Sequence, residues 1–346
     1  MYLVRLTCRF SVVSLALAAS LAAPEVKGQE ERVDECQPDL CITTLTEMPV
    51  GITSFGAAVC DGAIYTWGGH DGAAHEYYQA GQNSVLRRLA LNGQGEWESV
   101  HDSKIGRQGL AMVSHAGKLY RMGGFEARNQ RGEEQNLHSV ATFEQFDPAT
   151  NQWTELPAMP EARSSFDAVV LGDKIYIMGG WALAGEGNTQ WSDTAYAYDL
   201  TSADSKWEKL PQPPFQRRAL SAAYQGDRLF VIGGMQKQGG PTRAVSIFDP
   251  DTGTWSAGPD LPGEDGMEGF GNSSFNVGGQ ICVTTYGGHV YQLSEDGTAW
   301  KKMGSLDSGR FFHRLLPVSD NAFALIGGAN MESGKTTEVE VIATKD

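Results

Sequence analysis

The sequence has 346 residues, of which 41% are hydrophobic, and its formal net charge is −15 at pH 7. A surface this acidic repels phosphate groups and anionic lipids, so the charge excludes nucleic acid as a partner. Glycine is abundant at 42 residues whereas proline is limited to 14, which favours a turn-rich all-β protein with a substantial core.

The first 28 residues are expected to contain a secretory signal peptide. Arg5 and Arg9 accompany the apolar run Phe10–Ala19, which is too short to span a membrane. We therefore expect an exported protein, periplasmic or secreted, with no transmembrane segment. Residues 29–41 would form an N-terminal arm. In an oxidising compartment Cys36 and Cys41 are expected to form a local disulfide in this arm, the alternative being two separate thiols.

Six similar units follow, between residues 42 and 346. Each contains a short apolar run that ends in a glycine pair. The first glycines of these pairs are 54 to 56 residues apart, except for a last interval of 40 residues. They are Gly68, Gly123, Gly179, Gly233, Gly287 and Gly327. So constant a period is the signature of a repeat architecture.

Each unit has the sequence pattern of several short strands. A two-residue turn such as Gly172-Asp173 separates two β-rich runs and predicts a hairpin. After the glycine pair a third strand ends in an aromatic residue, and a turn then leads to a tryptophan, as in the segment from Phe146 to Trp153. Four antiparallel strands per unit are typical of a β-propeller blade. We assign the glycine pairs and these tryptophans to structure, and Cys60 and Cys282 to buried strand positions.

The repeats resemble a known family. The glycine pair, the aromatic residue followed by Asp, the spaced Trp, and Met159-Pro160 followed by Arg163 are similar to the Kelch repeat over about residues 42 to 342. The resemblance implies an all-β fold, a six-bladed Kelch-type β-propeller with four antiparallel strands per blade. The last unit lacks a fourth strand, while Ile42–Pro49 aligns with Trp153–Pro160. We therefore expect the N-terminal strand to close the ring and remove the exposed sheet edges.

The loops that follow the glycine pairs are expected to form the functional face. They span about 14 residues in the first unit (His70–Asn83), 13 in the second (Phe125–Leu137) and 12 in the third (Trp181–Ser192). The fourth and sixth units have seven residues each, and the fifth has no such loop. Long loops on a rigid scaffold are common places for binding sites. This face should be raised over the first three blades and low over the fifth.

Four arginines recur at one position of the repeat, 16 or 17 residues before the first glycine of the pair. They are Arg107, Arg163, Arg217 and Arg310. Guanidinium groups bind carboxylates through paired hydrogen bonds, so we expect an anion site at the channel mouth. The Kelch resemblance implies the same, because arginines at this position can contact ligands in Kelch modules that bind acidic peptides. Trp181, His70 and Asp71 would line the site. The alternative is that the arginines brace the blades and that Trp181 covers the core.

Two functions fit these residues. The Kelch resemblance favours a monomeric binding module whose loop-bearing face takes an acidic protein, peptide or glycan. The alternative is a sugar mutarotase or epimerase acting on N-acetylneuraminate or a similar acidic sugar, because an exported chain of Kelch blades resembles bacterial N-acetylneuraminate mutarotases in architecture. Glu126, Glu186 and Glu268 are then the candidates for proton transfer.

No cofactor or metal is expected. The cluster formed by His70-Asp71 and His75-Glu76 follows no standard zinc-ligand spacing. Galactose oxidase is a less similar Kelch protein, because its propeller has seven blades and its copper site needs tyrosine, histidine and cysteine residues that cannot be placed in this sequence.

Overall fold

The structure is a computed structural model that describes residues 34–92, 95–187, 189–202 and 204–344. The expected signal peptide lies outside the described residues. The described part consists of strands and loops, and its only helical segment is one short 3₁₀ helix, η1 (Gln79–Gly81). The expectation of an all-β fold is confirmed.

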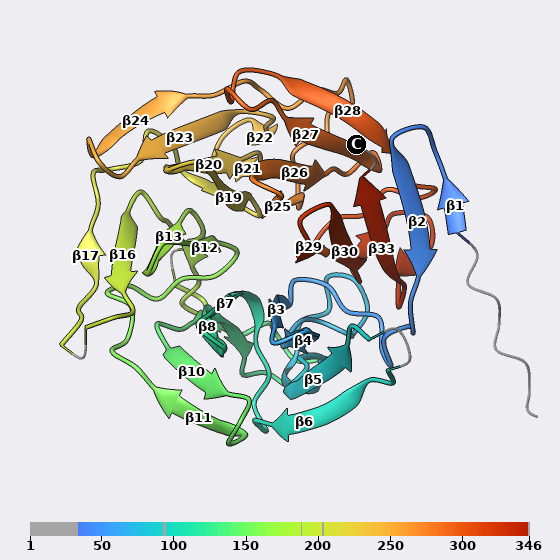
Figure 1. The fold of residues 1–346 in the computed structure, drawn as a ribbon. Coiled ribbons are helices and arrows are strands. Elements are labelled where there is room, and N and C mark those ends of the chain that lie inside the picture. Colours follow the sequence, from blue (N-terminus) through green and yellow to red (C-terminus); the bar gives the residue numbers. More distant parts are fainter. Residues whose placement is uncertain (1–33, 93–94, 188, 203, 345–346) are drawn as a thin grey trace, which may run out of the picture. The chain divides into compact units, whose positions relative to one another are not determined.

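Most strands belong to six antiparallel sheets of at least four strands (Figure 1). Sheet 1 contains β3 (Gly56–Cys60), β4 (Ala63–Trp67), β5 (Val85–Ala90) and β6 (Glu98–Asp102). Sheet 2 contains β7 (Gln108–His115), β8 (Lys118–Ala127), β10 (Phe143–Asp147) and β11 (Gln152–Glu155), with β9 (Leu137–Ser139) paired to β8. Sheet 3 contains β12 (Asp167–Leu171), β13 (Lys174–Met178), β16 (Ala195–Asp199) and β17 (Glu208–Lys209).

The other three sheets repeat this order. Sheet 4 contains β19 (Ser221–Gln225), β20 (Arg228–Ile232), β23 (Val245–Asp249) and β24 (Thr254–Ala257). Sheet 5 contains β25 (Ser273–Val277), β26 (Gln280–Thr284), β27 (His289–Leu293) and β28 (Trp300–Ser305). Sheet 6 contains β29 (Arg314–Ser319), β30 (Ala322–Ile326), β33 (Val339–Thr344), β2 (Leu40–Thr44) and β1 (Asp34–Cys36).

The first hairpin of each sheet turns within two residues, as the sequence predicts. At Asp61-Gly62 and Ala116-Gly117 both residues have positive φ, between 46° and 71°. Positive φ at both central positions is the geometry of a type I′ turn, whose twist matches that of the flanking strands. The turn therefore sets the register in which β3 pairs with β4 and β7 pairs with β8.

The first strands of the sheets contact one another in chain order. Strands β3, β7, β12, β19, β25 and β29 each contact the next, and β29 contacts β3 (Figure 1). Six residues just before these strands, or at the start of one of them, have positive φ and are joined by backbone hydrogen bonds of 2.7–3.2 Å; Gly109 is the one that lies within its strand, β7. Each N–H donates to the corresponding carbonyl of the preceding repeat, and the first donates to the last. The six residues are Ser54, Gly109, Ser165, Ala219, Gly271 and Phe312.

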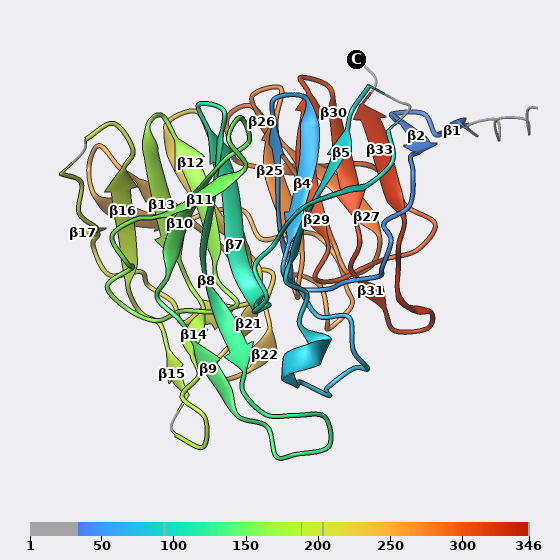
Figure 2. The ribbon, with the colours of Figure 1, turned by 90° about the horizontal axis from the view of Figure 1, so that it is seen from below.

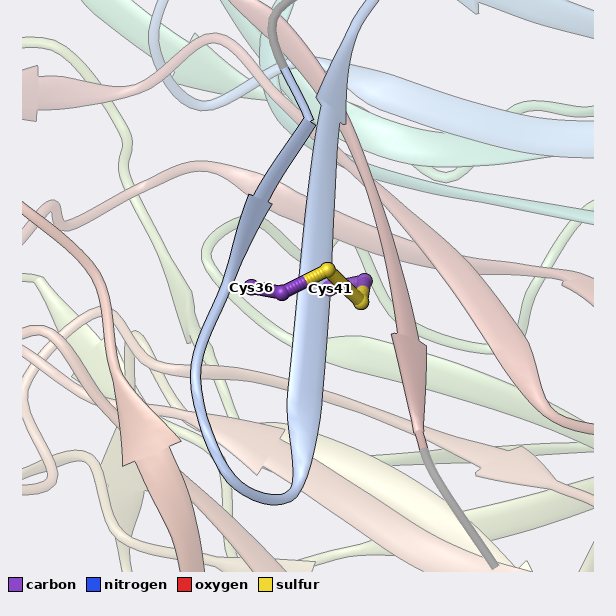
Figure 3. The surroundings of a disulfide bond; sticks show 2 residues. All are labelled: Cys36 and Cys41. Atoms are coloured by element: carbon purple, nitrogen blue, oxygen red, sulfur yellow. A yellow bond between two sulfur atoms is a disulfide. The ribbon is translucent and has the colours of Figure 1, made fainter.

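The N-terminal arm adds strands to the last sheet. Strand β2 pairs antiparallel with β33, so that Ile42 lies opposite Ile342, and it supplies the fourth strand of sheet 6. Strand β1 folds back on β2, and Cys36 and Cys41, opposite each other in this hairpin, form a disulfide (Figure 3). The expected local disulfide is confirmed.

Apolar side chains pack between neighbouring sheets. One cluster joins Val169 and Tyr176 of sheet 3 to Val231 and Phe248 of sheet 4. Trp255 packs against this cluster and donates its Nε1–H to a carbonyl of the crossing before sheet 4, at 2.9 Å. Other repeat tryptophans donate to equivalent carbonyls. They are Trp97, Trp207 and Trp300. The assignment of these tryptophans to structure is confirmed.

The free cysteines and the glycine pairs also have structural positions. Cys60 and Cys282 are buried, and burial raises the pKa of their thiols to about 11 and about 12. The N–H of Gly124, the second glycine of its pair, donates to the Arg163 carbonyl at 2.9 Å. A Cβ atom on Gly123 would lie 2.5 Å from that same carbonyl oxygen. Only glycine permits this approach at the positive φ found there.

Candidate functional site

The loops after the glycine pairs lie at one end of the sheets, here called the loop-bearing face (Figure 2). They contain η1, the β9 strand and several short strands that pair in small sheets of their own. These are β14 (Trp181–Ala182), β15 (Gln190–Trp191), β21 (Met235–Gln236), β22 (Gly240–Pro241), β31 (Ala329–Asn330) and β32 (Gly334–Lys335). Strand β18 (Arg217–Arg218), in the crossing before sheet 4, pairs with β21. The expected second loop is partly strand, because β8 continues to Ala127 before the chain turns.

The loops of sheets 1, 2 and 3 are hydrogen-bonded to one another. The Gln82 side chain donates to the Phe125 carbonyl at 3.0 Å and accepts from the Ala127 N–H at 2.7 Å. The Ser139 N–H in turn donates to the Leu183 carbonyl at 2.9 Å. These bonds join three loops that are far apart in the sequence into one wall.

The four repeat arginines are buried, with 0–6% of each residue exposed. Arg163 donates from Nη1 to the carbonyls of Gly179 and Thr194, at 3.0 and 2.9 Å. Arg107 and Arg217 bond the first glycine carbonyl of their own repeats in the same way. In these three repeats the guanidinium group thus fastens the glycine pair to the segment that forms the third strand, whereas Arg310 bonds to carboxylates only among the described residues.

Three of these arginines also pair with carboxylates of their own repeats. The pairs are Arg107 with Glu144, Arg163 with Glu161, and Arg310 with Glu338 and Glu340. Arg217 has no carboxylate within ion-pair distance among the described residues, and its Nη2 donates to Ser246 Oγ at 2.8 Å. These contacts are those of the bracing alternative, and none joins one repeat arginine to another. Ligand contact by any of the four stays a prediction.

Trp181 lies beside an arginine that the sequence analysis did not select. The Arg218 guanidinium carbon lies 4.0 Å from the Trp181 ring centroid and 5.7 Å from that of Trp191. The two indole rings are 5.6 Å apart and edge to face. In the described part of the chain Arg218 has no carboxylate partner, and its Nε and the Trp181 Nε1 are buried without hydrogen-bond acceptors. Burial lowers the pKa of Arg218.

The sequence contained a signal for this arginine. Arg218 directly follows Arg217, at the position that holds Gln108 in the second repeat and Ser164 in the third. A charge at a position that is uncharged in neighbouring repeats indicates a role outside the repeat itself. Spacing to the glycine pair selected Arg217 and therefore missed its neighbour.

The predicted His70-Asp71 pair divides between the interior and the surface. His70 is buried, its Nε2 lies 3.0 Å from the Glu76 carbonyl oxygen, and burial lowers its pKa. The Asp71 side chain is exposed on the first loop. The Tyr77 ring lies 5.2 Å from that of His70, and Tyr77 and Arg218 interact electrostatically. Tyr77 is thus the residue of this loop that lies near Arg218.

The three candidate glutamates lie in separate segments. Glu126 is half-buried in β8, and Glu186 is exposed between β14 and β15. Glu268 precedes β25 and is 3% exposed, with Oε2 lacking a hydrogen-bond donor in the described structure. Burial raises the pKa of Glu268, and nearby Thr285 and His289 oppose that shift. Of the three, Glu268 is the one whose surroundings favour a protonated carboxyl group.

The described residues offer neither a metal site nor a membrane-spanning helix. They contain no group of three or more His, Cys, Asp or Glu side chains placed to hold a metal ion. Within the same residues no helix has the length and apolar character needed to cross a membrane.

Known structures and sequences share this architecture. A solved structure titled "Structure of YjhT" superposes with a TM-score of 0.69 over 87% of this chain and 99% of its own, at 16% identity. With the sheet topology described above, this likeness makes the fold a β-propeller. The Kelch motif family matches residues 106–160, 162–214 and 216–262. The chain therefore contains Kelch motifs in its central part.

Several curated relatives carry the same motif. Kelch-like protein terF of Aspergillus terreus is 27% identical over 226 residues, which are 64% of this chain and 47% of the relative. Kelch-like protein 35 of Mus musculus is 25% identical over 64% of this chain and 33% of its own length. Kelch domain-containing protein 8B of Rattus norvegicus is 34% identical over 43% of this chain and 41% of its own. The matches span a third to a half of these relatives.

Proposed function

We propose that this protein is a closed six-bladed Kelch propeller whose loop-bearing face binds an acidic ligand, which is a protein, a peptide or a glycan. The cycle of backbone hydrogen bonds that includes Ser54 and Phe312 supports six blades, and the pairing of β2 with β33 supports closure by the N-terminal strand. Closure ties the last blade to the N-terminal strand, so the loops stand on a rigid base.

The observation that carries the proposed function is the environment of Arg218. The chain has 42 acidic and 27 basic residues, yet this half-buried arginine has no acidic partner among the described residues. A cation that is partly removed from water loses hydration free energy, and a hydrogen-bonded anion compensates that loss. A ligand carboxylate would supply that anion.

The surrounding rings prepare Arg218 for such a ligand. Stacking on Trp181 fixes the plane of the guanidinium group, which then presents its outer N–H groups in a defined direction. Tyr77 of the first loop interacts electrostatically with Arg218. A charge-assisted hydrogen bond contributes about 1.5–3 kcal/mol, so losing one should weaken binding roughly ten- to a hundredfold.

Calorimetric titration with a panel of acidic glycans and peptides tests this function. Arg218→Gln should weaken binding of any ligand found by at least about tenfold and reduce its salt dependence. Arg228→Gln is the matched control, because Arg228 is exposed at the two-residue turn of sheet 4 and should leave binding unchanged. Equal binding by both variants and the parent would exclude Arg218 from the site.

A sugar mutarotase is the second candidate, and Glu268 is the observation that favours it. A buried carboxyl group with a raised pKa keeps its proton to higher pH than an ordinary glutamate and can pass it to a sugar ring oxygen. The likeness to YjhT at 16% identity supports the fold alone. Anomer exchange of N-acetylneuraminate, followed by NMR, should be accelerated by the parent protein and not by Glu268→Gln. No acceleration by the parent would remove this candidate.

Export and a monomeric state complete the proposal. The disulfide between Cys36 and Cys41 supports an oxidising compartment, because such bonds are rare in the reducing cytosol. Mass spectrometry of the protein recovered outside the cytoplasm, and sedimentation of the purified protein, test these two points.

A further inference from the structure

Sheet 4 lacks the acidic residues that lie beside the repeat arginine in the second, third and sixth repeats. Val245 pairs with Ile232 in the register in which Phe143 pairs with Met122 in sheet 2. This register puts Ser246 at the position of Glu144, the partner of Arg107. Sheet 6 has Glu340 at the same position, as a partner of Arg310.

The second acidic position is also neutral in this repeat. Glu161 stands two residues before Arg163 and pairs with it at 3.2 Å. Two residues before Arg217 the chain has Phe215, whose ring centroid lies 4.2 Å from the Arg217 guanidinium carbon. Arg217 therefore rests on an aromatic ring in place of a carboxylate.

The hydrogen bonds that Arg217 makes leave donor hydrogens unused beside Ser246. Arg217 donates from Nη1 to the carbonyls of Gly233 and Ala244, and from Nη2 to Ser246 Oγ. These bonds leave the second Nη2 hydrogen and the Ser246 hydroxyl hydrogen available. Two neighbouring donors of this kind suit the two oxygens of one carboxylate. Burial lowers the pKa of Arg217 to about 10, and Asp260, beyond ion-pair distance, is the acid that opposes this shift.

Arg217 and Ser246 line a groove of about 780 Å³ on the loop-bearing face. The groove also contains Lys237 and Asp193, and the Asp193 carboxylate accepts a hydrogen bond from a glutamine side chain at 3.2 Å. Four glutamines line its walls. They are Gln212, Gln216, Gln236 and Gln238. Because two cations face one acid, the groove has a net positive charge in a strongly acidic protein.

We propose that this groove binds a sugar acid, whose carboxylate occupies the place that a glutamate fills in sheets 2 and 6. The side-chain amides can both donate to and accept from sugar hydroxyl groups, and a volume in the range of small-ligand pockets accommodates a short acidic saccharide. The inference rests on the proposed function, because it places an acidic ligand on the same face but at Arg217 rather than at Arg218.

A glutamate introduced at position 246 tests the inference without removing the buried arginine. Ser246→Glu should pair with Arg217, as Glu144 pairs with Arg107, and should raise the melting temperature while abolishing the binding of D-glucuronate. Gln238→Glu is the matched control, since it adds the same charge at an exposed position of the groove. It should weaken binding less than about threefold, against more than tenfold for Ser246→Glu.

The probes are D-glucuronate, D-glucose and a glutamate-rich peptide, each followed by ligand-observed NMR. Binding of D-glucuronate but not D-glucose, lost in Ser246→Glu, supports the inference. Binding of the peptide alone, or equal binding of D-glucuronate by Ser246→Glu and the parent, overturns it. If an acidic ligand is lost in Arg218→Gln and kept in Ser246→Glu, the proposed function stands and the inference about Arg217 fails.

Discussion

One ion pair links sheets that are far apart in the chain. Arg314 of sheet 6 donates from Nη1 to Asp167 of sheet 3 at 3.2 Å, and from Nε to the Phe55 carbonyl before sheet 1 at 2.8 Å. Its Nη2 donates to the Leu110 carbonyl of sheet 2 at 3.1 Å. The other Asp167 oxygen accepts from the Ala222 N–H of sheet 4 at 2.9 Å. Two side chains therefore connect five sheets.

Replacing Arg314 with Met should destabilise the fold strongly. Breaking a buried ion pair by removing one partner costs about 3–5 kcal/mol. The side chains of Arg314 and Asp167 are 21% and 10% exposed, beside a cavity of about 360 Å³, so some hydration of the remaining Asp167 lowers this cost. We expect a loss of about 3 kcal/mol in the free energy of unfolding.

A double-mutant cycle in urea unfolding measures the pair. Asp167→Asn alone should also destabilise, and the double variant should lose less than the sum of the single losses, by about 1–3 kcal/mol. Arg228→Met, at the exposed first residue of β20, controls for loss of an arginine. Additive losses, or a change below about 1 kcal/mol for Arg314→Met, would refute the linking role.

Three further predictions concern titration and the disulfide. Burial and two nearby arginines lower the pKa of His313 to about 3. Its neutral form therefore stabilises the fold above pH 6.5, and this stabilisation is lost as the pH falls. His313→Leu should flatten the acid side of a plot of melting temperature against pH. Burial raises the pKa of Glu268, so its protonated form contributes stability at a pH below the ordinary glutamate pKa, and this stability is lost as the pH rises. The melting temperature of Glu268→Gln should therefore rise relative to that of the parent as the pH is raised. Parallel plots of melting temperature against pH for the two proteins would contradict the burial argument. Cys36→Ser with Cys41→Ser should lower the free energy of unfolding by about 2 kcal/mol or less, measured in urea, because the closed loop is short.

Much of the fold follows from local sequence rules. The glycine pairs, two-residue turns and spaced tryptophans are short-range patterns, and each predicts a strand or a turn in its own part of the sequence. The disulfide was also predictable, since Cys36 and Cys41 are only five residues apart in a chain expected to be exported. That the two cysteines face each other in a hairpin is seen only in the structure. Blade count and closure were expected from the same repeats, and they remain part of the proposal.

The candidate site was less predictable, because it depends on contacts between repeats. A spacing rule finds Arg107 and Arg163 but does not reveal that their guanidinium groups bond glycine carbonyls and carboxylates of the same repeat. Arg218 owes its surroundings to Trp181, a loop residue of another sheet, and to Tyr77 of the first loop. The sequence of a single repeat does not predict which loops of other repeats will contact it.

The central claim is that an acidic ligand binds at Arg218 on the loop-bearing face, and mapping the binding site of such a ligand tests it most directly. In proton–nitrogen correlation spectra, titration with an acidic glycan or peptide that binds should shift the indole N–H signals of Trp181 and Trp191, beside Arg218, and leave those of Trp97 and Trp300 in place. The shifts should be lost in Arg218→Gln and absent with a neutral analogue. Shifts confined to residues of the two-residue turns, or shifts of Trp181 that persist in Arg218→Gln, would contradict binding at the loop-bearing face through this arginine.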